Sequence, residues 1–190
     1  KGESMNLYEA IFVRKSVRNY CFDTLCVQGN PEAKSVDLSG AISVPLVQSA
    51  TFAHPGLGKS TGYDYSRLSN PTRKFLEETV AALDGAKFGF AFSCGMAAET
   101  AFFSMLETKS HIISSDDIYG GSLRLFNTIV KKQGIETTFV DTSSLEQIER
   151  AFRPDTKIVF IETPGNPLMT VTDIQKTAEL AHSHGALLVV

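Results

Sequence analysis

The stretch KIVFIETPGNP, residues 157–167, decides the fold of this chain. Four consecutive apolar residues, 158–161, are followed at once by an acid, a threonine and two prolines that flank a glycine and an asparagine. A short, continuous apolar run is typical of a strand buried on both faces, as in a parallel sheet covered by helices. The polar loop that follows it is a candidate binding loop, because such sheets bind ligands at the carboxyl ends of their strands.

The sequence around this stretch alternates between short apolar runs and segments with helical periodicity. We predict further strands at 88–92, 111–114, 136–140 and 186–190, and helices at 71–84, 95–106, 121–132, 145–152 and 173–184. Alternation with short links is the signature of an α/β fold in which helices cover both faces of a mostly parallel sheet. Since the last predicted strand reaches the end of the sequence, we expect a longer domain whose C-terminal part is missing here.

The helix predicted from Pro71 has a clear start signal. Asn70 can accept a hydrogen bond from a first-turn amide, and Pro71 suits the first helical position because it lacks an N–H group. Leu76, Val80 and Leu83 recur at helical spacing and form one apolar stripe.

Composition excludes several classes of protein. The 190 residues include 18 Lys and Arg against 21 Asp and Glu, so the formal charge is −3, and the pI is about 5.8. This balance offers no general attraction to nucleic acid or an anionic membrane, and no apolar run is long enough to span a bilayer. Three cysteines are too few for a disulfide scaffold. We therefore predict a cytoplasmic protein without nucleic-acid or membrane partners.

Three segments differ in character. Residues 1–20 carry a charge balance of 4 − 2 = +2, whereas the remainder of the chain has 14 − 19 = −5. Residues 21–69 contain glycine and proline too often for long elements, and we interpret them as an arm that contacts a neighbouring subunit. Residues 70–190 hold the regular alternation and are predicted to form the first part of the large domain.

Three loops carry the polar residues that chemistry would need: 93–98, 116–121 and 162–167. The first has small residues at a helix start, which favours a phosphate, although close packing of strand on helix is an alternative. The second places Tyr119 beside two glycines, where its ring could stack on a flat ligand or pack over the helix start. The third holds Glu162 and Asn166. A rigid turn would explain the two prolines of this loop, but it would not need either of these polar residues.

Cys94 offers a different chemistry. A cysteine between a strand and a helix could be the nucleophile of a cysteine hydrolase, but Phe92 is larger than such an elbow accepts two positions earlier. The histidines and cysteines have no metal-ligand spacing, so no metal site is predicted.

Together these motifs resemble the pyridoxal-phosphate enzymes of cysteine and methionine metabolism, which include cystathionine γ-synthase, the cystathionine lyases, methionine γ-lyase and O-acylhomoserine sulfhydrylases. The motifs follow the family order over about 22–190: YDYSR at 63–67, NPTR at 70–73, ALDGA at 82–86, SCGMAA at 93–98, DIYGG at 117–121 and ETPGNP at 162–167. The resemblance implies a three-layer, fold-type I large domain that binds pyridoxal 5′-phosphate.

The implied function is trans-sulfuration, by elimination or replacement at the β- or γ-carbon of a small sulfur amino acid. A cystathionine γ-synthase or lyase is the first expectation, and methionine γ-lyase or O-acylhomoserine sulfhydrylase is the alternative. An identical neighbouring subunit, in a dimer of dimers, is the implied partner.

The resemblance also assigns roles to single residues. The implied cofactor-binding residues are Tyr65, Arg67, Ser93, Gly95, Met96, Tyr119, Glu162 and Asn166. Tyr65 and Arg67 would reach the cofactor phosphate of the neighbouring subunit, and the helix start at 93–96 would hold the phosphate within the subunit. Tyr119 would stack on the pyridine ring and act as the catalytic residue on protons near the departing group. Asn166 would hydrogen-bond the phenolic oxygen of the ring, with Glu162 behind it.

One departure from the family pattern is large. The Schiff-base lysine of the family lies in a Ser-x-Thr-Lys stretch that follows the strand at 186–190, and no lysine in this sequence matches it. The aspartate that pairs with the pyridine nitrogen also lies beyond Val190. A non-catalytic fragment is therefore an open alternative for these residues alone.

The start of the chain resembles another family. Residues 5–20, MNLYEAIFVRKSVRNY, are similar to the opening of flavin-dependent nitroreductases, whose Arg-x-Ser-x-Arg contacts the flavin phosphate. A flavoprotein is thus an alternative, and a fused basic helix is the simpler interpretation.

Overall fold

A computed structural model describes residues 22–29, 41 and 43–190 of the chain. They belong to two compact units, the first ending at Ala91 and the second running over Phe92–Val190. Residues 5–20, which resemble the opening of nitroreductases, lie outside the described ranges. Within those ranges, no helix combines the length and apolar character needed to cross a membrane.

The described part of the first unit contains two helices, α2 (Phe22–Gln28) and α3 (Pro71–Leu83). Gly29, which follows α2, has a positive φ of 75°, and a side chain there would collide with the ring of Phe75 on α3. Asn70 accepts a hydrogen bond from the Thr72 amide at 2.9 Å, as its predicted role at the start of α3 requires.

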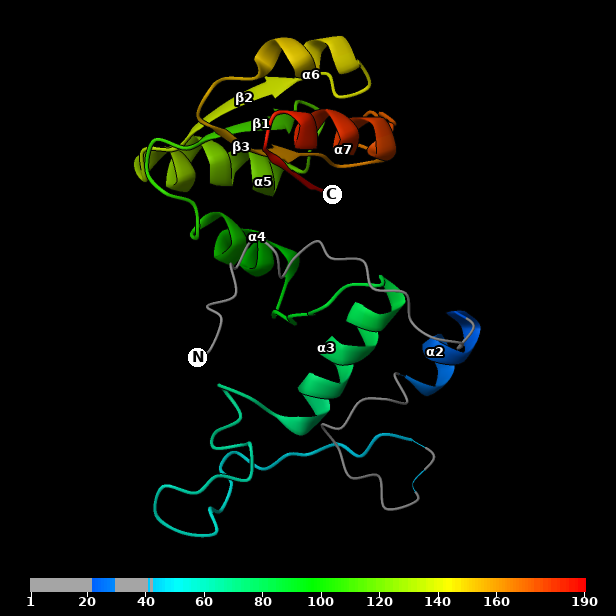
Figure 1. The fold of residues 1–190 in the computed structure, drawn as a ribbon, viewed down its shortest axis with the longest axis vertical. Coiled ribbons are helices and arrows are strands. Elements are labelled where there is room, and N and C mark those ends of the chain that lie inside the picture. The colour runs from blue at the N-terminus through cyan, green and yellow to red at the C-terminus, as the bar shows by residue number, and fades with distance from the viewer. Residues whose placement is uncertain (1–21, 30–40, 42) are drawn as a thin grey trace. The chain divides into compact units, whose positions relative to one another are not determined.

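The second unit is built on a four-stranded parallel sheet in the order β2-β1-β3-β4 (Figure 1). Its strands are β1 (His111–Ser115), β2 (Glu136–Val140), β3 (Thr156–Phe160) and β4 (Leu187–Val189). Its helical segments are α4 (Gly95–Phe103), α5 (Gly120–Leu125), the π-helical η1 (Phe126–Val130), α6 (Leu145–Ala151) and α7 (Ile174–Ser183). The predicted strands at 111–114, 136–140, 157–162 and 186–190 are confirmed, with ends that differ by one or two residues.

Apolar side chains cover both faces of this sheet. Ile112 and Ile158 point to one face and pack with Phe103 and Phe126 from α4 and η1. The next residues along the strands point to the other face, where Ile148 of α6 packs. Since successive side chains of a strand alternate between faces, both cores follow from the continuous apolar runs. The result is the predicted three-layer α/β arrangement.

Three predictions about local structure are wrong. Residues 88–92 form no strand, and the side chain of Phe90 is 70% exposed, since a strand needs a neighbouring strand and none of the described segments pairs with this one. Leu76 and Val80, predicted to form an apolar stripe, are exposed on α3, which buries Ala81 instead. The helix predicted to reach residue 106 ends at Phe103. The helix predicted at 121–132 is confirmed in extent, although residues 126–130 adopt π geometry.

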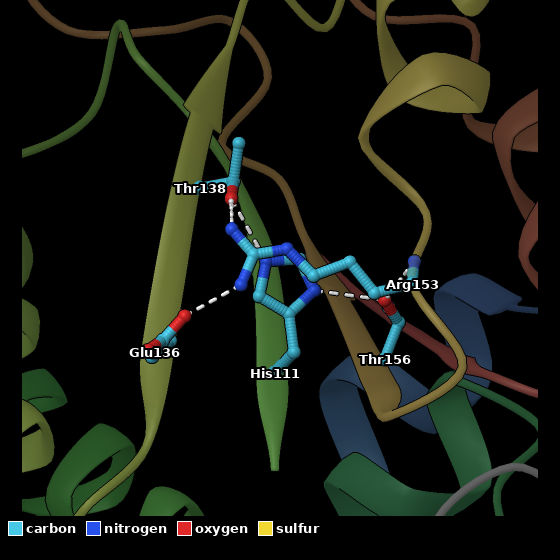
Figure 2. Close-up of polar contacts among 5 residues, drawn as sticks. All are labelled: His111, Glu136, Thr138, Arg153 and Thr156. Atoms are coloured by element: carbon cyan, nitrogen blue, oxygen red, sulfur yellow. Dashed lines mark hydrogen bonds and ion pairs between the residues drawn. The ribbon is translucent and has the colours of Figure 1, made fainter. Parts of the chain in front are cut away.

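A polar cluster lies at the amino ends of the strands (Figure 2). The side chain of His111 is fully buried, and its two ring nitrogens lie 2.8 Å from the hydroxyls of Thr156 and Thr138. Arg153 donates to Glu136 at 2.5 Å and to Thr138 at 3.2 Å. A buried histidine is tolerated here because both nitrogens have partners.

His111 should make stability depend on pH. Burial lowers its pKa below the ordinary 6.5, and Arg153 lowers it further, while Asp155 and Glu136 oppose the change. The unfolded chain therefore binds the proton more readily, so this contribution to stability is complete above about pH 6.5 and is lost as pH falls towards the folded-state pKa. Between about pH 6.5 and the folded-state pKa, His111 should make the free energy of unfolding change by at most about 1.4 kcal/mol per pH unit. We expect the His111→Gln variant to lack this pH dependence.

Urea unfolding of the full-length protein between pH 7.5 and 5 measures this slope. His182→Asn is the control, because His182 is exposed on α7 whereas His111 is buried. Equal slopes for wild type and His111→Gln would contradict the prediction.

Candidate functional site

Two of the three candidate loops leave neighbouring strands at the same edge of the sheet. The loop 116–121 follows β1, and the loop 162–167 follows β3, which pairs directly with β1 in parallel. Parallel neighbours have their carboxyl ends together, so the two loops are brought side by side. The third loop, 93–98, enters α4, which belongs to the same unit.

The loop 93–98 ends in an exposed helix start. Cys94 occupies the N-cap in an extended conformation, and Ser93, Cys94 and Gly95 are all exposed. The first-turn amides of Gly95 and Met96 have no acceptor within the helix, as at any helix start. Amides in this position, together with the helix dipole, can bind an anionic group.

Gly121 connects this helix start with the Tyr119 loop. A Cβ atom on Gly121 would lie 2.9 Å from the sulfur of Met96 and 2.9 Å from Cδ1 of Tyr119. Both contacts are too close for a side chain at this position, so Gly121 allows Met96 and the tyrosine ring to approach one another. This role is not evident from the sequence alone.

A hydrogen bond holds the backbone of Tyr119, while its side chain is exposed. Its amide donates to the Glu162 carboxylate at 2.8 Å, and 52% of the residue is exposed. No described residue contacts its hydroxyl by a hydrogen bond. A phenol held in this way can stack on a flat ring or exchange a proton with a ligand.

Asn166 lies on an exposed part of the 162–167 loop, between two prolines whose preceding peptide bonds are cis. The buried Asp117 holds this segment by accepting hydrogen bonds from the amides of Leu168 and Thr170 at 3.0 and 3.2 Å. Burial alone would raise the pKa of Asp117, but these hydrogen bonds outweigh it and lower the pKa below the ordinary 3.8. Asp117 is therefore a charged acceptor at neutral pH, a role that the sequence analysis missed.

In the first unit, Tyr65 and Arg67 lie together. The guanidinium of Arg67 stands 5.0 Å from the centre of the Tyr65 ring. Arg73 of α3 donates to the carbonyls of Ser66 and Leu68, at 2.9 Å each, and so holds the turn that carries the pair. The role of Arg73 was also missed.

The remaining candidates are less informative. Cys94 has a φ of −162°, an ordinary extended value, and lacks the strained turn of a nucleophile elbow. Among the described residues, no group of histidine, cysteine and acidic side chains could hold a metal ion.

The arrangement in the second unit suits a ligand that combines an anionic group with an aromatic ring. Exposed amides at 95–96, the ring of Tyr119 and the amide of Asn166 belong to loops that are linked by contacts at Gly121, Glu162 and Asp117. These are hydrogen-bond donors and a stacking surface, and the carboxylates of Asp117 and Glu162 in the same loops are engaged by backbone amides.

Comparison with known proteins gives consistent relatives. Cystathionine gamma-lyase of Bacillus subtilis is 47% identical over 152 residues, which cover 80% of this chain and 40% of that protein. Cystathionine gamma-synthase of Haemophilus influenzae is 43% identical over 175 residues, or 91% of this chain and 47% of the relative. A crystal structure of cystathionine gamma-lyase from Lactobacillus plantarum, complexed with L-serine, superposes with a TM-score of 0.82 at 40% identity, covering 89% of this chain and 44% of that one.

The chain thus spans less than half the length of these relatives. The comparisons do not bear out the likeness of residues 5–20 to nitroreductases. The sequence profile described as Cys/Met metabolism PLP-dependent enzyme matches residues 23–190. The chain belongs to this family of pyridoxal-phosphate-dependent enzymes.

Proposed function

We propose that the full-length protein containing this chain catalyses elimination or replacement at the β- or γ-carbon of a sulfur amino acid, with cystathionine as substrate or product. The observation that carries the proposal is the 47% identity to a cystathionine gamma-lyase, joined by relatives named as cystathionine beta-lyase and gamma-synthase. These three names differ in the bond that is made or broken, and they share cystathionine.

The residues of the second unit fit pyridoxal phosphate. The amides of Gly95 and Met96, with Ser93, would hold the phosphate, because the helix start is exposed and a side chain on Gly95 would meet only open space. Tyr119 would stack on the pyridine ring, and Asn166 would donate to its phenolic oxygen. When bound, the cofactor supplies an electron sink for the negative charge left at carbon after proton loss.

Tyr119 is the proposed catalytic residue. Its amide is occupied by Glu162, while the phenol is half exposed and free to approach a ligand. A phenol in this position can accept or return a proton near the group that departs from the substrate. The Glu162 carboxylate orients Tyr119 through its backbone amide.

For the first unit we propose that residues 21–69 are an arm that presents Tyr65 and Arg67 to the cofactor phosphate of an identical neighbouring subunit. The stacked pair and the two hydrogen bonds from Arg73 support this proposal, because they hold a fork-shaped cation in one orientation. Residues 70–190 would then be the first part of the cofactor-binding domain, within a dimer of dimers in the cytoplasm.

Arg67→Ala should weaken pyridoxal phosphate binding by about 10- to 100-fold, the loss expected for hydrogen bonds from a charged group to a phosphate. Arg67→Lys should recover only part of the affinity, because lysine cannot donate in a fork. Equilibrium dialysis of the full-length protein measures the dissociation constant. Lys59→Ala is the control, as a cation of the same unit outside the Tyr65 turn. Full affinity in the Arg67→Ala protein would contradict the role.

The function is tested by assaying the full-length protein with cystathionine, methionine, and O-acetylhomoserine plus sulfide, while the visible absorbance of bound pyridoxal phosphate is recorded. We expect a cofactor band and turnover or synthesis of cystathionine. Methionine cleavage without activity on cystathionine would favour a methionine γ-lyase. The absence of both a band and turnover would overturn the proposal.

A further inference from the structure

Two carboxylates join the loops that follow β1 and β3, and each loop provides one of the two carboxylates. Asp117, on the loop after β1, accepts hydrogen bonds from the amides of Leu168 and Thr170 on the loop after β3. Glu162, at the end of β3, accepts a hydrogen bond from the amide of Tyr119 on the loop after β1. Each loop thus supplies the acceptor that fixes the backbone of the other.

The two ties differ in burial and in the number of oxygens used. Asp117 is only 6% exposed and engages one amide with each oxygen, at 3.0 and 3.2 Å. Glu162 is half-buried and engages one amide with one oxygen, at 2.8 Å. Hydrogen bonds to a charged acceptor are stronger than neutral ones, and more so away from water. Asp117 is therefore the stronger tie.

The segment bound by Asp117 is also held by hydrogen bonds between its own residues. The amide of Gly165 donates to the carbonyl of Thr170 at 2.8 Å, and the Met169 amide donates to the carbonyl of Gly165 at 3.2 Å. At the base of the loop, the Thr172 amide donates to the Thr163 hydroxyl at 3.0 Å. A restraint on this segment is therefore passed to Asn166, which lies within it.

We propose that Asp117 and Glu162 are positioning residues that form a reciprocal brace. Asp117 fixes the loop that carries Asn166, and Glu162 fixes the backbone of Tyr119. The side chains of Asn166 and Tyr119 then approach bound pyridoxal phosphate in fixed positions relative to one another, instead of moving independently on two loops. The assignment to this ligand rests on the proposed function, whereas the brace itself is a property of the chain.

The test compares four variants of the full-length protein. Asp117→Asn replaces one of two engaged oxygens by a donor, so it should disrupt the brace although it is nearly isosteric. Glu162→Gln keeps one acceptor oxygen and should retain the single bond, whereas Glu162→Leu should not. Asp116→Asn is the matched control, because Asp116 is the exposed neighbour of Asp117.

Three readouts are needed. Amide hydrogen exchange in cofactor-free protein reports the brace directly at Leu168, Thr170 and Tyr119. The dissociation constant of pyridoxal phosphate and the visible circular dichroism of the bound cofactor report the position of the ring. We expect Asp117→Asn to speed exchange at residues 168 and 170 by about tenfold or more, to weaken cofactor binding by a similar factor and to change the dichroism.

Glu162→Leu should speed exchange at Tyr119 and change the dichroism, and Glu162→Gln should behave like wild type. If Asp117→Asn fails to fold, the comparison of Glu162→Leu with Glu162→Gln tests the brace. Unchanged exchange in Asp117→Asn and Glu162→Leu would overturn the brace. Faster exchange with unchanged cofactor affinity and dichroism would overturn the positioning role and leave a merely structural tie.

The outcomes also separate this inference from the proposed function. If wild-type protein binds no pyridoxal phosphate, the proposed function fails and the positioning role fails with it. The exchange rates at 168 and 170, which need no cofactor, would still show whether the brace exists.

Discussion

Phe126→Ala should lower the free energy of unfolding by about 3–5 kcal/mol, the usual loss when a fully buried phenylalanine is truncated. Phe126 is 1% exposed and lies at the centre of an aromatic cluster under the sheet. Its ring centre is 4.8 Å from that of Phe103 and 5.5 Å from that of Phe160, both in edge-to-face orientation. Removal of the ring therefore loses both the buried apolar area and two favourable aromatic contacts.

Ile129→Ala is the matched control for this prediction. Ile129 lies in the same π-helical segment but is 47% exposed, so its truncation should cost about 1 kcal/mol or less. Urea unfolding of both full-length variants measures the two losses. Similar losses for the two residues would show that η1 is not anchored through Phe126.

Gly165→Ala should have the second large effect, and it should act on both stability and the site. A Cβ atom at this position would overlap the carboxylate of Asp117 and lie 2.7 Å from the Asp117 carbonyl oxygen. Gly165 is itself buried, so the 162–167 loop must move away from the β1 loop. We expect a loss of about 1–3 kcal/mol in stability, the range for overpacking, together with weaker cofactor binding.

Gly56→Ala is the control, because a Cβ there meets only the flexible end of Lys59 at 3.8 Å. Thermal unfolding and pyridoxal phosphate dialysis of both full-length variants test the prediction. Wild-type stability and affinity in Gly165→Ala would mean that the two loops are not in close contact.

The parallel α/β sheet could be predicted because each strand carries its own signal. The run 158–161 and its counterpart at 187–190 are apolar without interruption, and local patterns of this kind need no knowledge of the partner strand. Helix starts were predictable for the same reason. Ser144 and Asp173 accept hydrogen bonds from amides three residues ahead, so the interaction lies within one turn of sequence.

The interactions that the sequence did not reveal join residues far apart in the chain. The amides bound by Asp117 are 51 and 53 positions away, and the hydroxyls around His111 are 45 and 27 positions away. Only the order of the strands brings these groups together. Residues 88–92 were assigned wrongly as a strand for a related reason, since apolar character does not tell whether a neighbouring strand exists.

The location of the His111 cluster has a consequence for laboratory evolution. A strand of five residues is about 16 Å long, so β1 keeps the cluster at its amino end well apart from the loops at its carboxyl end. Substitutions this far apart usually have additive effects. Acid tolerance and the properties of the candidate site can therefore be selected in separate libraries, and the selected substitutions can then be combined in one gene.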